Sequence, residues 1–292
     1  MAAWIETYRG TVSAWECDIT EHFTIAYYFD RLGEAERSLT EVLGLREFLR
    51  GGGFSRRYEV RFVRELRAGA SFHIESAPIG LGIDGVLRLG HRVINSATGE
   101  TVTWIDELWD LPHGAIPTER RSTLGDLFVH WDGPASEPRP EPARLDGFIA
   151  SARGRVKPAD LSVDGRFGLA AMVHRFTDSS VQTGAAIGMD ADYLAANRRG
   201  FSTFELALRI TGSLALDEMY LIETGIAHLG NSSLRFVHRM VDPRSGSEVA
   251  RLSQYGVNLD LDARRPTKWP DDVRKRATAL VVPLEDAAPV TV

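Results

Sequence analysis

The sequence predicts an α+β protein made of two similar halves, each an antiparallel sheet wrapped around one long helix. The first observation is an ungapped internal repeat, in which residues 9–36 match residues 153–180, each position 144 further on (153 − 9). The second is that the one long helix pattern in each half is followed by strand patterns. A sheet of this kind exposes an edge strand, and pairing the halves edge to edge removes it. We therefore expect a pseudo-two-fold pair that shares one continuous sheet.

The repeat is long enough to indicate a duplicated domain, because solenoid repeats have periods of up to roughly 50 residues. Glu16 matches Asp160 and Arg31 matches Arg175, and later in the copies His91 matches His238. The copies differ just before the helix, where Asp18 and His22 of the first copy become Ser162 and Arg166 of the second. Two similar halves therefore carry different polar groups at this point.

In the first copy, residues 8–14 alternate as a strand does, and a helix follows, for which Thr24 is a suitable N-cap. Gly51-Gly52-Gly53 ends this region, and strand patterns then cover residues 57–65, 71–77, 86–95 and 101–109. The second copy repeats this order, with strands near residues 203–210, 219–227, 233–241 and 248–259. The stretch 134–144 is rich in proline and reads as an extended linker. The expected domains are residues 1–133 and 145–280, with a loose tail at 281–292.

The composition of the 292 residues is that of a soluble globular protein, and the net charge of −6 argues against a nucleic-acid partner. A single cysteine, Cys17, excludes an internal disulfide and a Cys-rich zinc site, and it is expected to pack as a small apolar side chain. The histidines have no metal-ligand spacing, so no metal is expected. No apolar run approaches about 20 residues and no signal-peptide pattern begins the chain, which predicts a cytoplasmic protein that does not enter membranes.

The segment from Trp15 to Phe29, WECDITEHFTIAYYF, resembles the hot-dog fold acyl-CoA thioesterases, whose pattern here is Asp-x-x-Gly-His-Met-Asn followed by Ala-x-Tyr. The segment from Gly256 to Pro270 is similar to the last strand and the Arg-Arg-Pro tail of that family. The resemblance implies a double hot-dog that hydrolyses an acyl-CoA or acyl-carrier-protein thioester, with no cofactor beyond the coenzyme A of the substrate. It leaves open whether double hot-dogs pair further into a homo-oligomer. The sequence departs from the pattern at Glu21, which replaces a glycine, and at Phe23 and Thr24.

The resemblance implies that Asp18 is the catalytic carboxylate, acting as general base or nucleophile. His22 would orient Asp18 or polarise the carbonyl, and Thr24 would cap the helix or contact the substrate. Backbone N–H groups at the helix N-terminus would stabilise the oxyanion. The competing interpretation is that Asp18 is a simple helix cap, a common role for an aspartate before a helix.

Four further sets of residues are secondary candidates. Glu34 and Asp178 occupy equivalent helix positions and are reserve catalytic carboxylates, although a solvated helix face with surface ion pairs is the favoured explanation. The coenzyme A phosphates would be bound by Arg57, Arg61, Arg264 and Arg265, which ordinary solvated surface also explains. His91 and His238, present in both copies, are expected to be buried and hydrogen-bonded. The small residues of the second helix, Ser179, Ser180, Thr183 and Gly184, predict that the second copy supplies walls of the acyl site while the first supplies the chemistry.

Two other functions compete with thioester hydrolysis. Hot-dog hydratases and dehydratases resemble Asp-x-Asn-Pro-x-His, whose histidine follows the aspartate by five residues; here His22 follows Asp18 by four and no Asn-Pro is present. A non-catalytic acyl-binding or assembly protein is the second alternative, and the departures at Glu21 and Thr24 keep it open.

Overall fold

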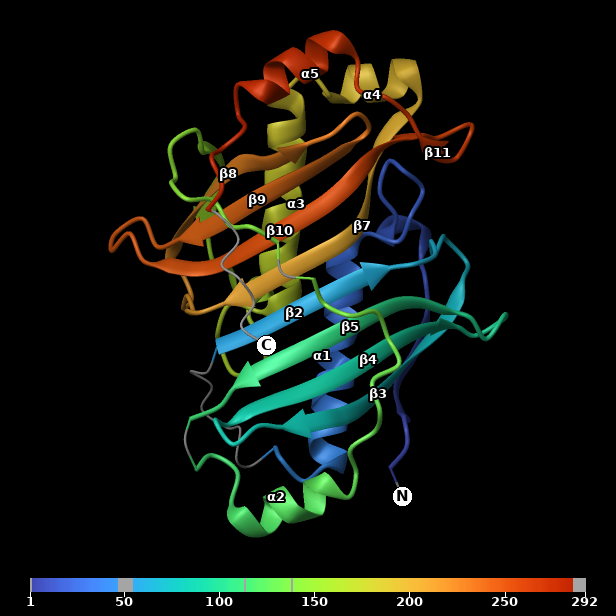
Figure 1. Cartoon of the computed structure of the whole chain (residues 1–292), viewed down its shortest axis with the longest axis vertical. Helices are drawn as coiled ribbons and strands as arrows, with labels where there is room; N and C mark the ends of the chain where they lie inside the picture. Colours follow the sequence, from blue (N-terminus) through green and yellow to red (C-terminus); the bar gives the residue numbers. More distant parts are fainter. Residues whose placement is uncertain (1, 47–54, 113, 138, 286–292) are drawn as a thin grey trace.

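The computed structural model describes residues 2–46, 55–112, 114–137 and 139–285. Within these residues eleven strands form one antiparallel sheet in the order β1-β3-β4-β5-β2-β7-β10-β9-β8-β6, with β11 paired to β10 (Figure 1). The strands of the first half are β1 (Ile5–Thr11), β2 (Ser55–Phe62), β3 (Ser71–Leu81), β4 (Val86–Asn95) and β5 (Thr101–Asp110). Those of the second half are β6 (Ile149–Arg155), β7 (Arg199–Ile210), β8 (Met219–Leu229), β9 (Ser233–Val241), β10 (Glu248–Asp260) and β11 (Arg265–Pro266).

The halves join edge to edge, as predicted from the sequence. Strand β2 pairs with β7 in a register that runs from Arg56↔Ile210 to Arg61↔Glu205. Each of these strands would be a free edge in an isolated half, so the pairing removes the exposed edge. The first strand was predicted at 8–14 and is observed at Ile5–Thr11. It ends before Ala14 because a short 3-10 turn begins there, at Ala14–Glu16.

Two long helices lie on one face of the sheet, one behind each half (Figure 1). They are α1 (Ile25–Val42) and α3 (Leu169–Ala186), which keep the 144-residue spacing of the repeat. They also touch each other, with the rings of Tyr27 and His174 at 5.1 Å. Three short helices escaped prediction: α2 (Thr118–Gly125), α4 (Ala191–Asn197) and α5 (Asp271–Thr278). Each is eight residues or shorter and buries at most two side chains, which is too little for a repeating apolar pattern.

One hydrophobic core runs across the junction of the halves. Phe29 of α1 packs edge-on against Tyr58 of β2, with ring centroids 5.7 Å apart. Phe176 of α3 and Leu206 of β7 belong to the same buried cluster. The fold is therefore one layer of helices on one sheet, with its core continuous between the halves.

Each half ties its 3-10 turn to its long helix through an equivalent ion pair. In the first half Arg31 pairs with the buried carboxylate of Glu16. In the second half Arg175 Nη2 lies 3.6 Å from Oδ1 of the buried Asp160. The repeat had matched these four residues to each other, and the structure gives the reason: a buried carboxylate needs a partner.

Residues between the halves cross the face of the sheet that the long helices leave free (Figure 1). Arg139 binds Glu205 of β7, and Arg235 of β9 donates to the carbonyl of Pro140.

Part of the predicted tail 281–292 is packed against the second half. Val282 is buried and its N–H donates to Ile226 O at 2.9 Å, while 286–292 lie outside the described residues. Gly51-Gly52-Gly53 also lie outside them. Within the described part of the chain, no helix is long and apolar enough to cross a membrane.

Candidate active site

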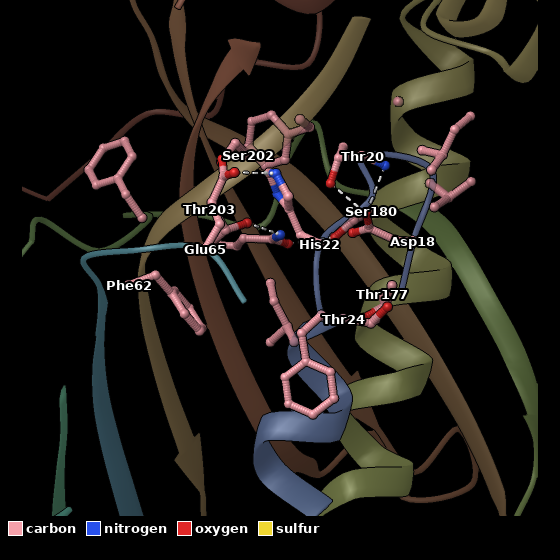
Figure 2. Close-up of a pocket in the computed structure, with 18 of the residues that line it drawn as sticks. Asp18, Thr20, His22, Thr24, Phe62, Glu65, Thr177, Ser180, Ser202 and Thr203 are labelled. Carbon is pink, nitrogen blue, oxygen red and sulfur yellow. Dashed lines mark hydrogen bonds and ion pairs between the residues drawn. The ribbon is translucent and has the colours of Figure 1, made fainter. Parts of the chain in front are cut away.

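A cavity of about 330 Å³ lies between the two halves. The first half contributes the loop that precedes α1 and the segment that follows β2, and the second half contributes α3, β7, β9 and β10 (Figure 2). Its walls are largely aromatic and aliphatic: Phe23, Tyr28, Phe62, Phe201, Phe204, Leu234, Phe236 and Trp269. Of the small α3 residues singled out in the sequence, Ser180 and Gly184 line the cavity, whereas Ser179 and Thr183 are not among its lining residues.

Asp18 lies on the wall of this cavity, at its exposed rim. Its Oδ1 accepts the backbone N–H of Thr20 at 2.8 Å and also the Thr20 hydroxyl. Figure 2 shows the carboxylate turned toward Thr20. No hydrogen bond of the described residues involves Oδ2, so this oxygen is available to a water or a substrate. Asp18 is thus not the N-cap of α1, a position that Thr24 occupies.

The turn that presents Asp18 contains a strained residue. Glu21 has φ 65°, in the left-handed region, and its N–H donates to Asp18 O at 2.9 Å. A side chain is disfavoured in this conformation, and the second half has Gly165 at the equivalent position with φ 76°. The expectation from the sequence, that glutamate replaces glycine here at a cost, matches this geometry.

The N-terminus of α1 opens into the same cavity. Thr24 is the N-cap, but its side chain makes no capping hydrogen bond, which leaves N–H groups of the first turn without a side-chain acceptor. Thr24 and Ile25 both line the cavity. The positive end of the helix dipole therefore faces space that a ligand oxygen can occupy.

His22 faces away from Asp18 and toward Glu65 (Figure 2). His22 Nε2 lies 2.9 Å from Glu65 Oε2 and 2.5 Å from Nη2 of Arg264, and Arg264 Nη2 lies 2.7 Å from the same Glu65 oxygen. The ring nitrogen accepts from Arg264 when it carries no proton and donates to Glu65 when it does. Burial lowers the pKa of His22; the Glu65 charge opposes that effect and the Arg264 charge adds to it.

The second half contributes a row of polar side chains to the cavity wall. Ser180 Oγ donates to Gln254 Oε1 at 2.6 Å, and Gln254 Nε2 donates to Thr203 Oγ1 at 2.6 Å. Ser180 Oγ also lies 3.2 Å from Nε2 of the buried His238, whose Nδ1 is 2.7 Å from Thr224 Oγ1. Burial lowers the pKa of His238 to about 3, so its ring is neutral.

His91 occupies the equivalent position in the first half and is also fully buried, as expected for both histidines. Its Nδ1 is 2.7 Å from Ser76 Oγ and its Nε2 is 3.0 Å from Glu107 Oε2. Glu36 of α1 completes this buried cluster by accepting from the Tyr58 hydroxyl at 3.2 Å and from Arg56. In the first half, large ionisable side chains therefore fill the place that corresponds to the polar wall of the cavity in the second half.

The reserve carboxylates and most of the predicted phosphate ligands lie elsewhere. Glu34 and Asp178 are exposed and do not line the cavity, and Asp178 pairs with Arg175 at 3.1 Å. Arg57 pairs with Asp110 at 3.1 Å and Arg61 with Glu205. Arg264 does not line the cavity and is bound to Glu65 at 2.7 Å, while Arg265 is an exposed residue of β11. Among the described residues that line the cavity, Arg64 is the one arginine, and no carboxylate lies within 4.0 Å of it.

Sequence reasoning missed Glu65, Thr203 and Gln254. Each reaches the cavity only through the pairing of distant segments, and none carries a spacing signal.

Cys17, next to Asp18, is half-buried, and burial raises the pKa of its thiol, which disfavours the reactive thiolate. Within the described ranges, no group of three or more histidine, cysteine and acidic side chains is placed to hold a metal ion.

Comparison with known proteins agrees with this architecture. Residues 156–277 match the family model described as the thioesterase-like superfamily. No curated protein sequence matches the chain.

Several solved structures share the fold of nearly the whole chain. An acyl-ACP thioesterase from Bacteroides thetaiotaomicron is similar with a TM-score of 0.61 at 11% identity, covering 85% of this chain and 96% of that one. A putative oleoyl thioesterase from Lactobacillus plantarum gives 0.64 at 14% identity, covering 88% and 97%. The 12:0-ACP thioesterase from Umbellularia californica gives 0.62 at 16% identity, covering 86% and 92%.

At these identities the structural similarity establishes the fold and nothing beyond it. The match to the thioesterase-like superfamily model is confined to residues 156–277, and the two halves of the chain together form a double hot-dog fold.

Proposed function

We propose that this chain hydrolyses an acyl thioester carried by coenzyme A or by acyl carrier protein. The observation that carries the proposal is that the Asp18 carboxylate and the N-terminus of α1 line one cavity. A base and an oxyanion site are the two elements that thioester hydrolysis requires. The thioesterases of similar fold, two of which are described as acting on acyl-ACP, support the same substrate class.

Asp18 acts on water as a general base in this proposal. Water attacks the carbonyl carbon while its proton passes to Asp18, and the oxyanion that forms is stabilised by N–H groups of the first turn of α1. The C–S bond then breaks, and the leaving thiolate takes up the proton. The alternative is that Asp18 attacks the carbonyl itself and forms an anhydride that water then hydrolyses.

The hydrogen bonds from Thr20 support either role. They hold Oδ1 and so fix the direction of Oδ2, the oxygen left for water or for the carbonyl carbon. Asp18 is exposed in the free protein, and a substrate that enters the cavity would cover it and exclude bulk water. His22, held by Glu65 and Arg264, borders the same space and is proposed to orient the thioester.

The test is hydrolysis by the full chain of a panel of acyl-CoA and acyl-carrier-protein thioesters, with detection of the free thiol. We expect Asp18→Asn to lower kcat by about 10²–10⁴. The matched control is Ser162→Ala at the equivalent position of the second half, which lies outside the cavity and should retain activity. A folded Asp18→Asn protein with near wild-type activity would remove Asp18 from the chemistry.

One observation favours a second candidate, a non-catalytic protein that binds acyl thioesters. Asp18 is exposed, whereas catalytic carboxylates are often partly shielded from water. The same panel separates the two functions: acyl-CoA binding measured by calorimetry without thiol release would support the binding protein. A hydratase is less well supported, because His22 points to Glu65 and not to Asp18.

A further inference from the structure

The polar row Ser180–Gln254–Thr203 lies in a cavity whose other walls are mainly apolar. All three side chains line the cavity, and Gln254 is only 8% exposed. Polar groups in such a place need hydrogen-bond partners, because an unpaired donor loses its water without replacement. Each N–H and O–H of the row should therefore have an acceptor.

The hydrogen bonds within the row leave some of its donors unused. The Gln254 amide has two N–H bonds, and one of them goes to Thr203. The Thr203 hydroxyl accepts that bond and keeps its own O–H, for which the described part of the chain provides no acceptor. Reversing the Gln254 amide changes which atoms face Ser180 and Thr203, but it still leaves one N–H of Gln254 without a partner.

The equivalent place in the first half has no such surplus. Glu36 corresponds to Ser180 (36 + 144), and Glu107 corresponds to Gln254 by the 147-residue spacing of His91 and His238 (238 − 91). Glu107 accepts from Trp109 and contacts His91, while Glu36 accepts from Tyr58, so these groups satisfy one another. The unused donors are thus a feature of the cavity and not of the shared scaffold.

The row and the reacting groups reach the cavity from different halves of the chain. Asp18, His22 and the start of α1 all belong to the first half, whereas α3, β7 and β10, which carry the row, belong to the second. Asp18 sits at the exposed rim, while Gln254 and its neighbour Phe236 are buried. A thioester with its carbonyl beside the exposed Asp18 would extend its acyl group into the cavity, toward the buried Gln254.

We propose that the Ser180–Gln254–Thr203 row binds an oxygen atom on the acyl group, so that the preferred substrates are hydroxy- or oxo-acyl thioesters and not plain hydrocarbon ones. This inference rests on the proposed thioesterase function. The hydroxyl or oxo oxygen accepts from Thr203 or from the spare N–H of Gln254, and the aromatic walls pack against the rest of the acyl group. A plain acyl chain would leave these donors unpaired. A site that hydrogen-bonds an oxygen of its substrate rejects an analogue that lacks this oxygen.

The experiment compares kcat/KM for matched acyl-CoA pairs that differ by one oxygen: butanoyl and 3-hydroxybutanoyl, octanoyl and 8-hydroxyoctanoyl, benzoyl and 4-hydroxybenzoyl. We expect at least one pair to show a preference of about tenfold or more for the oxygenated member. Thr203→Val should reduce that preference severalfold, and Thr203→Ser, which keeps the hydroxyl, should retain it. Both members are measured on one preparation, so the ratio does not depend on the fraction of folded protein.

Two results would overturn the inference: hydrolysis with no oxygen preference in any pair, or a Thr203→Val effect that is equal for both members of each pair. The second result would place the row at the thioester or the pantetheine arm. Binding of the same pairs to Asp18→Asn, measured by calorimetry, separates this inference from the proposed function. A preference in Kd without hydrolysis by the wild type would refute the thioesterase and retain the acyl-oxygen site, whereas neither binding nor hydrolysis would refute both.

Discussion

Nε2 of His22 lies 2.9 Å from Oε2 of Glu65, and this pair joins the loop before α1 to the segment after β2. Arg264 of the second half donates into the same pair, with Nη2 2.5 Å from His22 Nε2. The histidine at the cavity is therefore held between a negative and a positive group that come from different halves. Its proton affinity depends on both.

The acid limb of the pH–rate profile should move in opposite directions when the two partners are removed. The Arg264 charge disfavours protonated His22 and the Glu65 charge favours it. We expect activity to need neutral His22, so Arg264→Gln, which raises the His22 pKa, should shift the acid limb to higher pH. Glu65→Gln should shift it to lower pH.

The measurement is kcat/KM against pH for the wild type and both variants. Arg265→Gln is the control, since Arg265 is exposed and outside the cavity. Equal shifts in the same direction for both variants would contradict the electrostatic account and indicate a general disturbance of the loop.

Replacing Glu21 by glycine should stabilise the protein. Glu21 has φ 65°, and Gly165 takes this conformation in the second half without the penalty of a side chain. We expect Glu21→Gly to raise the free energy of unfolding by about 1 kcal/mol, measured by urea denaturation. Gly165→Ala, the matched reverse change, should lower it by a similar amount. A destabilised Glu21→Gly protein would mean that the glutamate side chain makes up for its strained backbone.

The sequence predicted the long helices and the central strands and missed the short elements. The strands Val86–Asn95 and Ser233–Val241 agree with prediction to the residue, and each ends at a turn. The 3-10 turns and the short helices α2, α4 and α5 span eight residues or fewer, too few for a repeating apolar pattern to mark them. Local patterns therefore sufficed for the scaffold.

The site was predictable in part, for a related reason. Asp18, His22 and Thr24 lie within one loop that a motif can describe, and all three line the cavity. Glu65 and Gln254 reach the cavity through strand pairing across the chain, which local spacing does not encode. The cavity itself depends on the absence of bulk at Ser180 and Gly184 of α3, and the small residues there were the one sequence signal for it.

Filling the cavity from α3 should shorten the acyl groups that the protein accepts. A Cβ added at Gly184 meets Met189 O at 3.7 Å, an ordinary contact, and a longer side chain extends into the cavity that Gly184 lines. We expect Gly184→Leu to lower kcat/KM for long acyl-CoAs by tenfold or more and to affect short ones little. Helix propensity should stabilise the variant by about 0.5–1 kcal/mol.

Gly33→Leu is the matched control for this change. Gly33 lies inside α1, a Cβ there meets nothing within 4 Å, and the residue does not line the cavity. It should gain the same helix stabilisation with an unchanged chain-length profile. If both variants alter the profile alike, the effect does not come from filling the cavity.

The buried Glu36 should make stability fall as pH rises. Burial, reinforced by the nearby Glu107 charge, raises the Glu36 pKa from 4.5 to about 8. The unfolded chain releases this proton near pH 4.5, whereas the folded protein keeps it until about pH 8, so the contribution is present below pH 4.5 and is lost as pH rises toward 8. The variant Glu36→Gln removes this titration.

The slope of unfolding free energy against pH between pH 5 and pH 8 should then become less negative in Glu36→Gln, by up to about 1.4 kcal/mol per pH unit. Glu34→Gln, two residues away on the exposed side of α1, should leave the wild-type slope unchanged. Urea denaturation of the three proteins between pH 5 and pH 8 gives the slopes, and parallel lines for the wild type and Glu36→Gln would show that Glu36 is already ionised in the folded protein.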